Sequence, residues 1–146
     1  MTDTPLRAGP EVRDRVRWSD VDRMEIVYFG RYLRFAEAAE TEFFRSAGFT
    51  YDEIAERFGV WIGRVRLTVD YRAPARLDDA IVCRAELVRL GGSSLTLLFP
   101  VDREGAPTEA RIRLADVRLT LAALDRRTLR PARLPPPLRA ALSAPR

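Results

Sequence analysis

One segment, residues 31–47, is apolar over most of its circumference when it is drawn as a helix. Its apolar residues recur at helical spacing and form a stripe along one side: Tyr32, Phe35, Ala36, Ala39, Phe43 and Ala47. Three neighbouring residues widen this stripe: Leu33, Ala38 and Phe44. Gly48 follows, and glycine often ends a helix because it adopts a left-handed conformation without strain. An apolar helix of this kind can be covered on most sides only by a sheet that curls around it.

The other periodic segments predict strands. Residues 12–18 alternate apolar with charged side chains, and residues 61–71 predict a half-buried strand. Its apolar face is formed by Trp61, Val65, Leu67, Val69 and Tyr71. Strands are also predicted at 80–90, 94–101 and 108–124, with a bulge near Ala115 and Asp116 where the alternation slips, and a short helical turn at 51–58. The order predicts an α+β domain, in which a curved antiparallel sheet of five or six strands wraps a long central helix.

The length of 146 residues is typical of a single domain. Residues 1–10 and 131–146 contain prolines without periodicity, so both are expected to be tails that flank one domain at 11–130. No apolar signal-peptide region and no bilayer-long apolar stretch are present, so we expect a cytoplasmic protein without integral membrane association. Cys83 is the only cysteine and histidine is absent, so neither a disulfide nor a metal site is expected.

The formal net charge of +4 raises the question of a nucleic-acid partner. All 25 basic residues are arginines, and the 21 acidic residues are interspersed with them along the chain. This pattern is typical of solvated faces and not of a dedicated basic stripe. We therefore expect no nucleic-acid partner.

Three carboxylates, Asp20, Asp22 and Glu25, lie within six residues just before the apolar helix. Charge in such a place is costly unless the backbone or a ligand stabilises it. In a structural interpretation, Asp20 makes a turn and Asp22 or Glu25 complements the helix dipole. In a functional interpretation, the carboxylates belong to a reaction site. The residues alone leave both open and favour the structural one.

The segment Asp20-Val21-Asp22-Arg23-Met24-Glu25-Ile26-Val27-Tyr28 resembles the Asp-x-Asp-x-x-Gly-x-Val-Tyr signature of the 4-hydroxybenzoyl-CoA thioesterase family. Residues 69–79 and 89–95 are similar to the acyl-CoA thioesterases associated with bacterial Tol-Pal gene clusters, and the resemblance spans about residues 12–135. It implies the hot-dog fold and hydrolysis of an acyl-CoA to a carboxylic acid and CoA. It also implies that Asp22 is the catalytic carboxylate, as general base or as nucleophile, and that an amide around Phe29 or Gly30 polarises the thioester carbonyl.

The same resemblance suggests where the substrate binds. We expect Tyr28 and Tyr32 at the helix start to contact the substrate, with Glu25 as a further candidate. The CoA moiety is expected at the turn formed by Arg89, Gly92, Ser93 and Ser94, for which a plain hairpin turn is an equal alternative. CoA would be part of the substrate, and no cofactor is expected.

Three residues depart from the family pattern. Glu25 replaces the usual glycine, Phe29 stands where a histidine is frequent, and Arg31 replaces a small or amide residue. Because glycine adopts a positive φ angle readily and glutamate does not, Glu25 puts the backbone conformation in question. Its side chain either points to solvent or lines the acyl pocket.

Other candidates are weaker. Glu37, Glu40 and Glu42 lie on the long helix, where some hot-dog thioesterases carry their carboxylate, but Glu40 and Glu42 are expected on an exposed face. Cys83 alternates with apolar neighbours and is expected in the core. Acyl hydratases of this fold use a catalytic histidine, which this chain lacks.

A non-catalytic acyl-CoA binding module remains the alternative to an enzyme, because of the departures at Glu25 and Phe29. The resemblance also implies a homo-oligomer, a dimer of dimers whose protomers pair their sheets edge to edge and share active sites.

Overall fold

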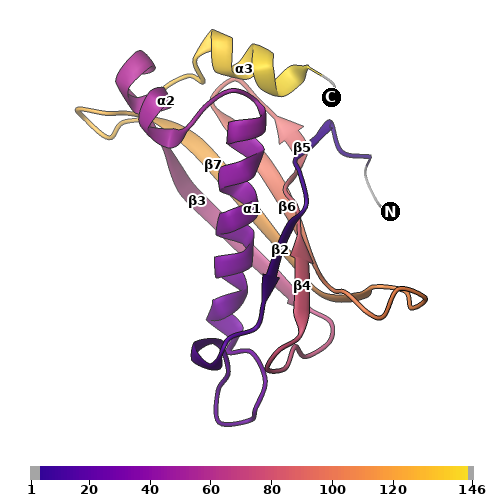
Figure 1. The fold of residues 1–146 in the computed structure, drawn as a ribbon. Coiled ribbons are helices and arrows are strands. Elements are labelled where there is room, and N and C mark those ends of the chain that lie inside the picture. Colours follow the sequence, from indigo (N-terminus) through magenta and orange to yellow (C-terminus); the bar gives the residue numbers. More distant parts are fainter. Residues whose placement is uncertain (1–3, 145–146) are drawn as a thin grey trace.

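The computed structural model describes residues 4–144. Its helical elements are η1 (Trp18–Asp20), η2 (Phe29–Arg31), α1 (Tyr32–Ser46), α2 (Tyr51–Phe58) and α3 (Pro136–Ser143). Its strands are β1 (Arg7–Ala8), β2 (Val12–Arg15), β3 (Val60–Tyr71), β4 (Ala80–Cys83), β5 (Glu86–Leu90), β6 (Ser94–Arg103) and β7 (Ile112–Asp125). The long helix α1 lies across one face of the twisted sheet (Figure 1), as the sequence predicted.

The sheet is antiparallel and has seven strands. Strand β6 is central: β7 pairs along one side of it, and β5 and β4 share the other side. Strand β3 pairs with β7 at one edge, while β1 pairs with β5 and β2 with β4. The count exceeds the expected five or six because the predicted strand at 80–90 is two strands separated at Arg84 and Ala85, and because β1 adds a short pairing.

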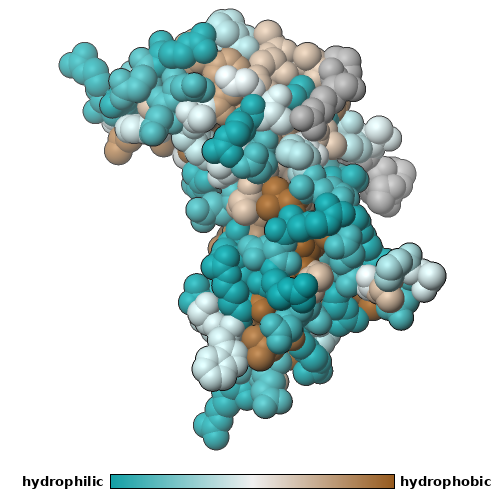
Figure 2. Space-filling model, in the orientation of Figure 1, coloured by the Kyte–Doolittle hydropathy of each residue, from teal (hydrophilic) through white to brown (hydrophobic). Residues whose placement is uncertain are grey.

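The core lies between α1 and the sheet. Its largest fully buried side chains come from α1, α2, the inward positions of the strands and α3: Phe35, Phe43, Phe44, Phe99, Ile54, Ile81, Leu87, Leu95, Leu97, Leu114, Leu121 and Leu138. Gly48 and Gly59 follow α1 and α2 with positive φ angles of 95° and 66°, so both predicted helix ends are confirmed. In the orientation of Figure 2, most of the surface is hydrophilic, and hydrophobic atoms show in its middle and near its lower end.

Bulges decide which side chains face the core. In β7, Val101 pairs with Ala115 and Asp102 with Arg113, so Leu114 is the extra residue, next to the predicted bulge. In β3, Arg64 pairs with Leu121 and Arg66 with Thr120, so Val65 is the extra residue.

The bulge in β3 overturns the prediction that Trp61 shares a face with Leu67, Val69 and Tyr71. A one-residue shift exchanges the two faces of a strand, so Arg64 takes a core-facing position. The strand is also less buried than predicted, since Leu67 is 45% exposed and Tyr71 50% exposed. As an edge strand it has a neighbour on one side only within this chain.

The described parts of the expected tails pack against the domain, so that expectation was wrong for residues 4–10 and 131–144. Leu134, Leu138 and Leu142 are buried, and α3 starts at Pro136, where proline is tolerated because the first amides of a helix need no helical acceptor. Arg7 donates to the carbonyl oxygens of Ser46 and Ala144 at 3.1 and 2.9 Å, and so links the ends of α1 and α3. The prolines misled the prediction because they mask a helical spacing of leucines, at Leu134, Leu138 and Leu142.

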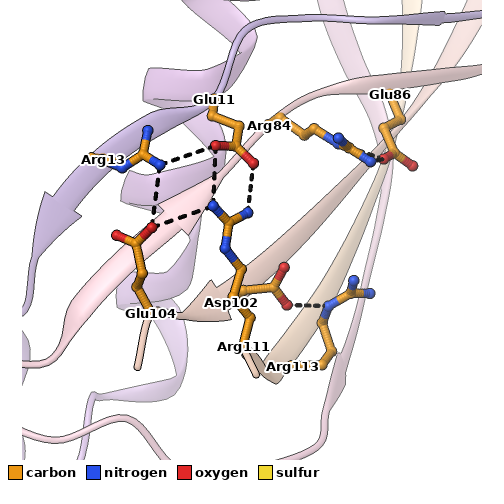
Figure 3. Close-up of polar contacts among 8 residues, drawn as sticks. All are labelled: Glu11, Arg13, Arg84, Glu86, Asp102, Glu104, Arg111 and Arg113. Carbon is orange, nitrogen blue, oxygen red and sulfur yellow. Dashed lines mark hydrogen bonds and ion pairs between the residues drawn. The ribbon is translucent and has the colours of Figure 1, made fainter. Parts of the chain in front are cut away.

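Arginine and acidic side chains pair across the strands (Figure 3). Glu11 and Glu104 each contact both Arg13 and Arg111, with Arg13 at 3.3 Å from Glu11 and 3.2 Å from Glu104. Arg111 holds the pKa of Glu11 below its usual range by a direct hydrogen bond. Positive charge here is matched locally by carboxylates.

Candidate active site

Asp22 opens a tight turn between two short extended segments that meet at the Val21–Val27 bridge. The amide of Asp22 donates to the carbonyl of Ile26 at 2.9 Å, and the amide of Glu25 donates to the carbonyl of Asp22 at 3.0 Å. The carboxylate Oδ1 of Asp22 accepts a hydrogen bond from the amide of Met24 at 2.7 Å. An Asx turn of this kind fixes the side chain relative to the backbone, so the carboxylate has a defined direction.

Glu25 occupies the left-handed position of this turn, with φ at 63°. The question raised by the missing glycine therefore has a clear answer: the backbone keeps the conformation that glycine would adopt most easily. The side chain is exposed and lines neither of the hollows described below. Of the two predicted orientations for Glu25, the structure supports the one toward solvent.

Asp20 is a structural residue. It is 1% exposed, accepts from the amide of Arg17 at 2.8 Å and forms an ion pair with Arg34 of α1 at 2.6 Å. Burial acts to raise its pKa, but the hydrogen bonds from Arg34 and Arg17 outweigh burial and hold the pKa below its usual range. The structural interpretation of the acidic loop thus holds for Asp20, which joins the loop to α1.

The start of the long helix lies beside this turn. The first helical hydrogen bond is donated by Arg31 to the carbonyl of Tyr28 at 2.8 Å. The amides of Phe29 and Gly30 precede it, so the helix itself provides no acceptor for them. Such amides carry partial positive charge at the end of the helix dipole and can stabilise an oxyanion.

Two aromatic side chains attach the helix start to the sheet. The hydroxyl of Tyr71, the last residue of β3, donates to the carbonyl of Phe29 at 2.6 Å. The rings of Tyr71 and Tyr32 meet edge to face with their centroids 5.3 Å apart. Tyr32 is 3% exposed, and its hydroxyl accepts from the amide of Ala75 at 3.3 Å. Burial raises the pKa of Tyr32, so the hydroxyl stays neutral.

Asp22 borders two hollows. One, of about 350 Å³, is mostly apolar and is lined by Asp22, Met24, Ile26, Val27, Phe29, Tyr32, Tyr71, Arg72, Ala73 and Pro74. The other, of about 450 Å³, is lined by Ser19, Val21, Asp22, Tyr28, Gly30 and Arg31. The carboxylate therefore lies between an apolar groove and a more polar hollow at the helix start.

The structure brings five of the predicted site residues together around these hollows: Asp22, Tyr28, Phe29, Gly30 and Tyr32. The expected CoA residues Arg89, Gly92, Ser93 and Ser94 lie at the turn between β5 and β6, at the opposite end of the sheet (Figure 1). There the carbonyls of Gly92 and Gly91 accept from the amide of Leu134 and the side chain of Arg139. Within one chain, the turn and Asp22 do not meet.

Sequence reasoning missed Tyr71. It was assigned only to the apolar face of a strand, yet its ring lines the groove and its hydroxyl contacts the helix start. A tyrosine at the end of a predicted strand, followed closely by Pro74, was the available signal.

The prediction that Glu40 lies on an exposed face was wrong. Glu40 is 2% exposed, accepts from Tyr51 of α2 and forms an ion pair with Arg64 at 2.7 Å. Burial raises its pKa, against the opposing effects of Tyr51 and Arg64. The core-facing position of Arg64 after the β3 bulge explains why a buried carboxylate is tolerated.

Cys83 is buried in β4, and burial raises the pKa of its thiol to about 12, so it is a core residue as predicted.

Across residues 4–144, no three acidic, cysteine or histidine side chains group closely enough to hold a metal ion. Over the same range, no helix combines the length and the apolar character needed to cross a membrane.

A sequence profile of the thioesterase-like superfamily matches residues 16–142. The chain belongs to the thioesterase-like superfamily. Over 127 residues it is 30% identical to the acyl-CoA thioesterase YbgC of Haemophilus influenzae, and the match covers 87% of this chain and 89% of that protein. The prediction of a thioester hydrolase is thereby confirmed at the level of the superfamily.

Solved structures of other proteins have the same fold. The hypothetical protein TT1821 from Thermus thermophilus superimposes with a TM-score of 0.79 at 31% identity, covering 91% of this chain and 96% of that one. The 1,4-dihydroxy-2-naphthoyl-CoA thioesterase Slr0204 from Synechocystis gives a TM-score of 0.78 at 18% identity, covering 92% and 95%. At that identity the likeness shows the fold alone, and the predicted hot-dog fold is confirmed.

Proposed function

We propose that this protein is an acyl-CoA thioesterase that uses Asp22 as its catalytic carboxylate. One observation carries the proposal: the fixed carboxylate of Asp22 and Gly30, the second residue of η2, border the same hollow. A thioester needs both groups, a base or nucleophile for the carbonyl carbon and a donor for the carbonyl oxygen. The printed activity of the Haemophilus influenzae relative supports the same substrate class.

In the reaction that we assign, the amide of Met24 anchors Oδ1 of Asp22, and Oδ2 accepts a proton from a water molecule. The hydroxide attacks the thioester carbon, and the resulting oxyanion is stabilised by the amides of Phe29 and Gly30. Collapse of the tetrahedral species breaks the C–S bond, and the CoA thiolate recovers the proton from Asp22. Direct attack by Oδ2, with a mixed anhydride hydrolysed in a second step, uses the same geometry. No cofactor takes part in either route.

We assign the apolar groove with Phe29 and Tyr32 to the acyl group and the β5–β6 turn to CoA. These two places lie at opposite ends of one chain, so a complete site needs a second copy. Strand β3 begins at Val60, which pairs with Asp125 at the end of β7 that contacts the β5–β6 turn. It ends at Tyr71, beside the apolar groove. Antiparallel pairing of β3 with the same strand of a second copy brings the turn of one protomer toward Asp22 of the other.

The exposure of β3 fits this pairing. Four apolar side chains, from both faces of the strand, are 39–58% exposed within one chain: Trp61, Val65, Leu67 and Tyr71. A homodimer through β3 covers them and leaves other surfaces free for a dimer of dimers. Oligomer mass, measured by sedimentation, tests this part of the proposal separately from activity.

The experiment that tests the proposed function is hydrolysis of a panel of aliphatic and aromatic acyl-CoAs, with release of free thiol followed for the wild type and for Asp22→Ala. We expect turnover of at least one substrate class by the wild type and its loss in the variant. Tight binding of acyl-CoA with no turnover of any member of the panel would instead support a binding module, the alternative for which Glu25 and Phe29 are the reasons.

A further inference from the structure

We propose that Tyr71 is a positioning residue for the thioester reaction, because its hydroxyl holds the Phe29–Gly30 peptide unit in the orientation that the oxyanion requires. The inference deepens the proposed function and rests on it. It assigns a role to a side chain from the edge strand β3, which is 42 positions from Phe29 in the sequence.

The geometry of the peptide bond links the two sides of this unit. The Tyr71 hydroxyl donates to the Phe29 carbonyl at 2.6 Å, and that carbonyl shares a planar trans peptide with the Gly30 amide. In a trans peptide the C=O and N–H groups point in opposite directions. Holding the carbonyl toward Tyr71 therefore turns the Gly30 amide away from Tyr71.

From their lining residues, we infer that the two hollows lie on opposite sides of this peptide unit. Tyr71 and Phe29 line the apolar groove, whereas Gly30 lines the polar hollow, and Asp22 borders both. The Gly30 amide is thus directed to the side where a thioester carbonyl next to Asp22 would place its oxygen. A hydrogen bond accepted by the carbonyl also polarises the amide and makes its N–H a better donor.

Tyr71 is itself held firmly enough to act in this way. Its backbone pairs with Ala115 of β7, and its ring packs edge to face on the buried ring of Tyr32. Tyr32 in turn accepts from the amide of Ala75. The contacts connect the sheet to the helix start through two aromatic rings.

If Tyr71 served only to pack, phenylalanine would replace it without loss. Tyr71→Phe keeps the ring on Tyr32 and removes only the hydroxyl. Thr41→Val is the matched control, since the Thr41 hydroxyl also donates to a backbone carbonyl of this region, that of Glu37 at 3.0 Å on α1, but away from both hollows.

The test measures kcat and KM on the best acyl-CoA, together with the ¹H–¹⁵N spectrum of the substrate-free protein. For Tyr71→Phe we expect kcat to fall about 10-fold with KM within about 2-fold, as for a lost interaction that acts in the transition state. We also expect the Gly30 amide resonance to move. Thr41→Val should change neither quantity.

Full kcat in Tyr71→Phe would overturn the inference, and so would an unmoved Gly30 resonance. Equal losses in Tyr71→Phe and Thr41→Val would also overturn it, because they would indicate a general effect on the helix. A wild type that hydrolyses no thioester would refute the proposed function and, with it, the catalytic role of Tyr71. The spectrum then still reports whether the hydroxyl orients the peptide unit.

Discussion

Replacing Glu25 with glycine should stabilise the protein, although it removes a charged side chain beside the assigned catalytic residue. Glu25 has φ at 63°, in the left-handed region where the Cβ of an L-residue crowds the following carbonyl. Its side chain is exposed, so its removal uncovers no packed surface. The turn around it is maintained by the backbone hydrogen bond from Asp22 to Ile26 and by the hydrogen bond that the Met24 amide donates to the Asp22 carboxylate.

The magnitude follows from two opposing terms. A non-glycine residue in the left-handed conformation costs about 1–2 kcal/mol. Glycine lowers the free energy of unfolding by about 0.5–1 kcal/mol, because it loses more conformational entropy on folding than other residues do. The expected net gain in the free energy of unfolding is about 0.5–1 kcal/mol. At about 2.1 cal/mol/K per residue, the unfolding entropy of this chain is about 0.3 kcal/mol/K, so Tm should rise by about 2–3 °C.

Thermal unfolding at a fixed protein concentration measures this shift, since an oligomer has a concentration-dependent Tm. Glu25→Ala and Glu25→Gln are the matched controls. Alanine keeps the Cβ, and glutamine keeps both the Cβ and the length, so neither should stabilise the protein by the backbone effect. A rise in Tm for Glu25→Gln equal to that for Glu25→Gly would show that charge repulsion, and not backbone strain, is relieved. That result would refute the reasoning.

Two further predictions concern the loop and the sheet edge. Asp20→Asn should lower the free energy of unfolding at pH 7 by about 2–3 kcal/mol, because it leaves Arg34 with Asp14 as its remaining acidic partner. Since the folded-state pKa of Asp20 is depressed, its contribution is present above the unfolded pKa and is lost as pH falls through the folded pKa. Urea unfolding at pH 7 and below pH 4 should therefore show a smaller acid-induced loss in the variant than in the wild type. Leu67→Asp should shift sedimentation toward the monomer, and an unchanged mass would count against pairing through β3.

Much of the fold was predictable because its signals are local. The apolar stripe of α1, the glycines after α1 and α2, and the phase slip in β7 each depend on residues that are close together in the sequence. The β3 bulge was not visible, since Trp61, Val65 and Tyr71 keep a regular alternation in the sequence while the backbone shifts by one residue. Only the pairing with β7 defines that shift.

The site was predictable in part for a similar reason. Asp22, Phe29 and Gly30 belong to one motif, and the structure brings them together. The contacts of Tyr71 and the pairing of the buried Glu40 with the half-exposed Arg64 depend on long-range packing, so no local sequence pattern indicates them. Arg64 lies next to the β3 bulge on the face toward α1, and there it supplies the positive charge that pairs with Glu40.

The central claim is that Asp22 carries the hydrolysis of an acyl-CoA thioester. The most direct measurement is kcat/KM for Asp22→Asn beside Glu25→Gln, on the acyl-CoA that the wild type hydrolyses best. Asparagine keeps the size of the side chain and can still accept from Met24, but it cannot take a proton from water. We expect Asp22→Asn to lose at least about 100-fold in kcat/KM and Glu25→Gln to stay within a few fold of the wild type. Full activity in Asp22→Asn, with activity abolished in Glu25→Gln, would contradict the account.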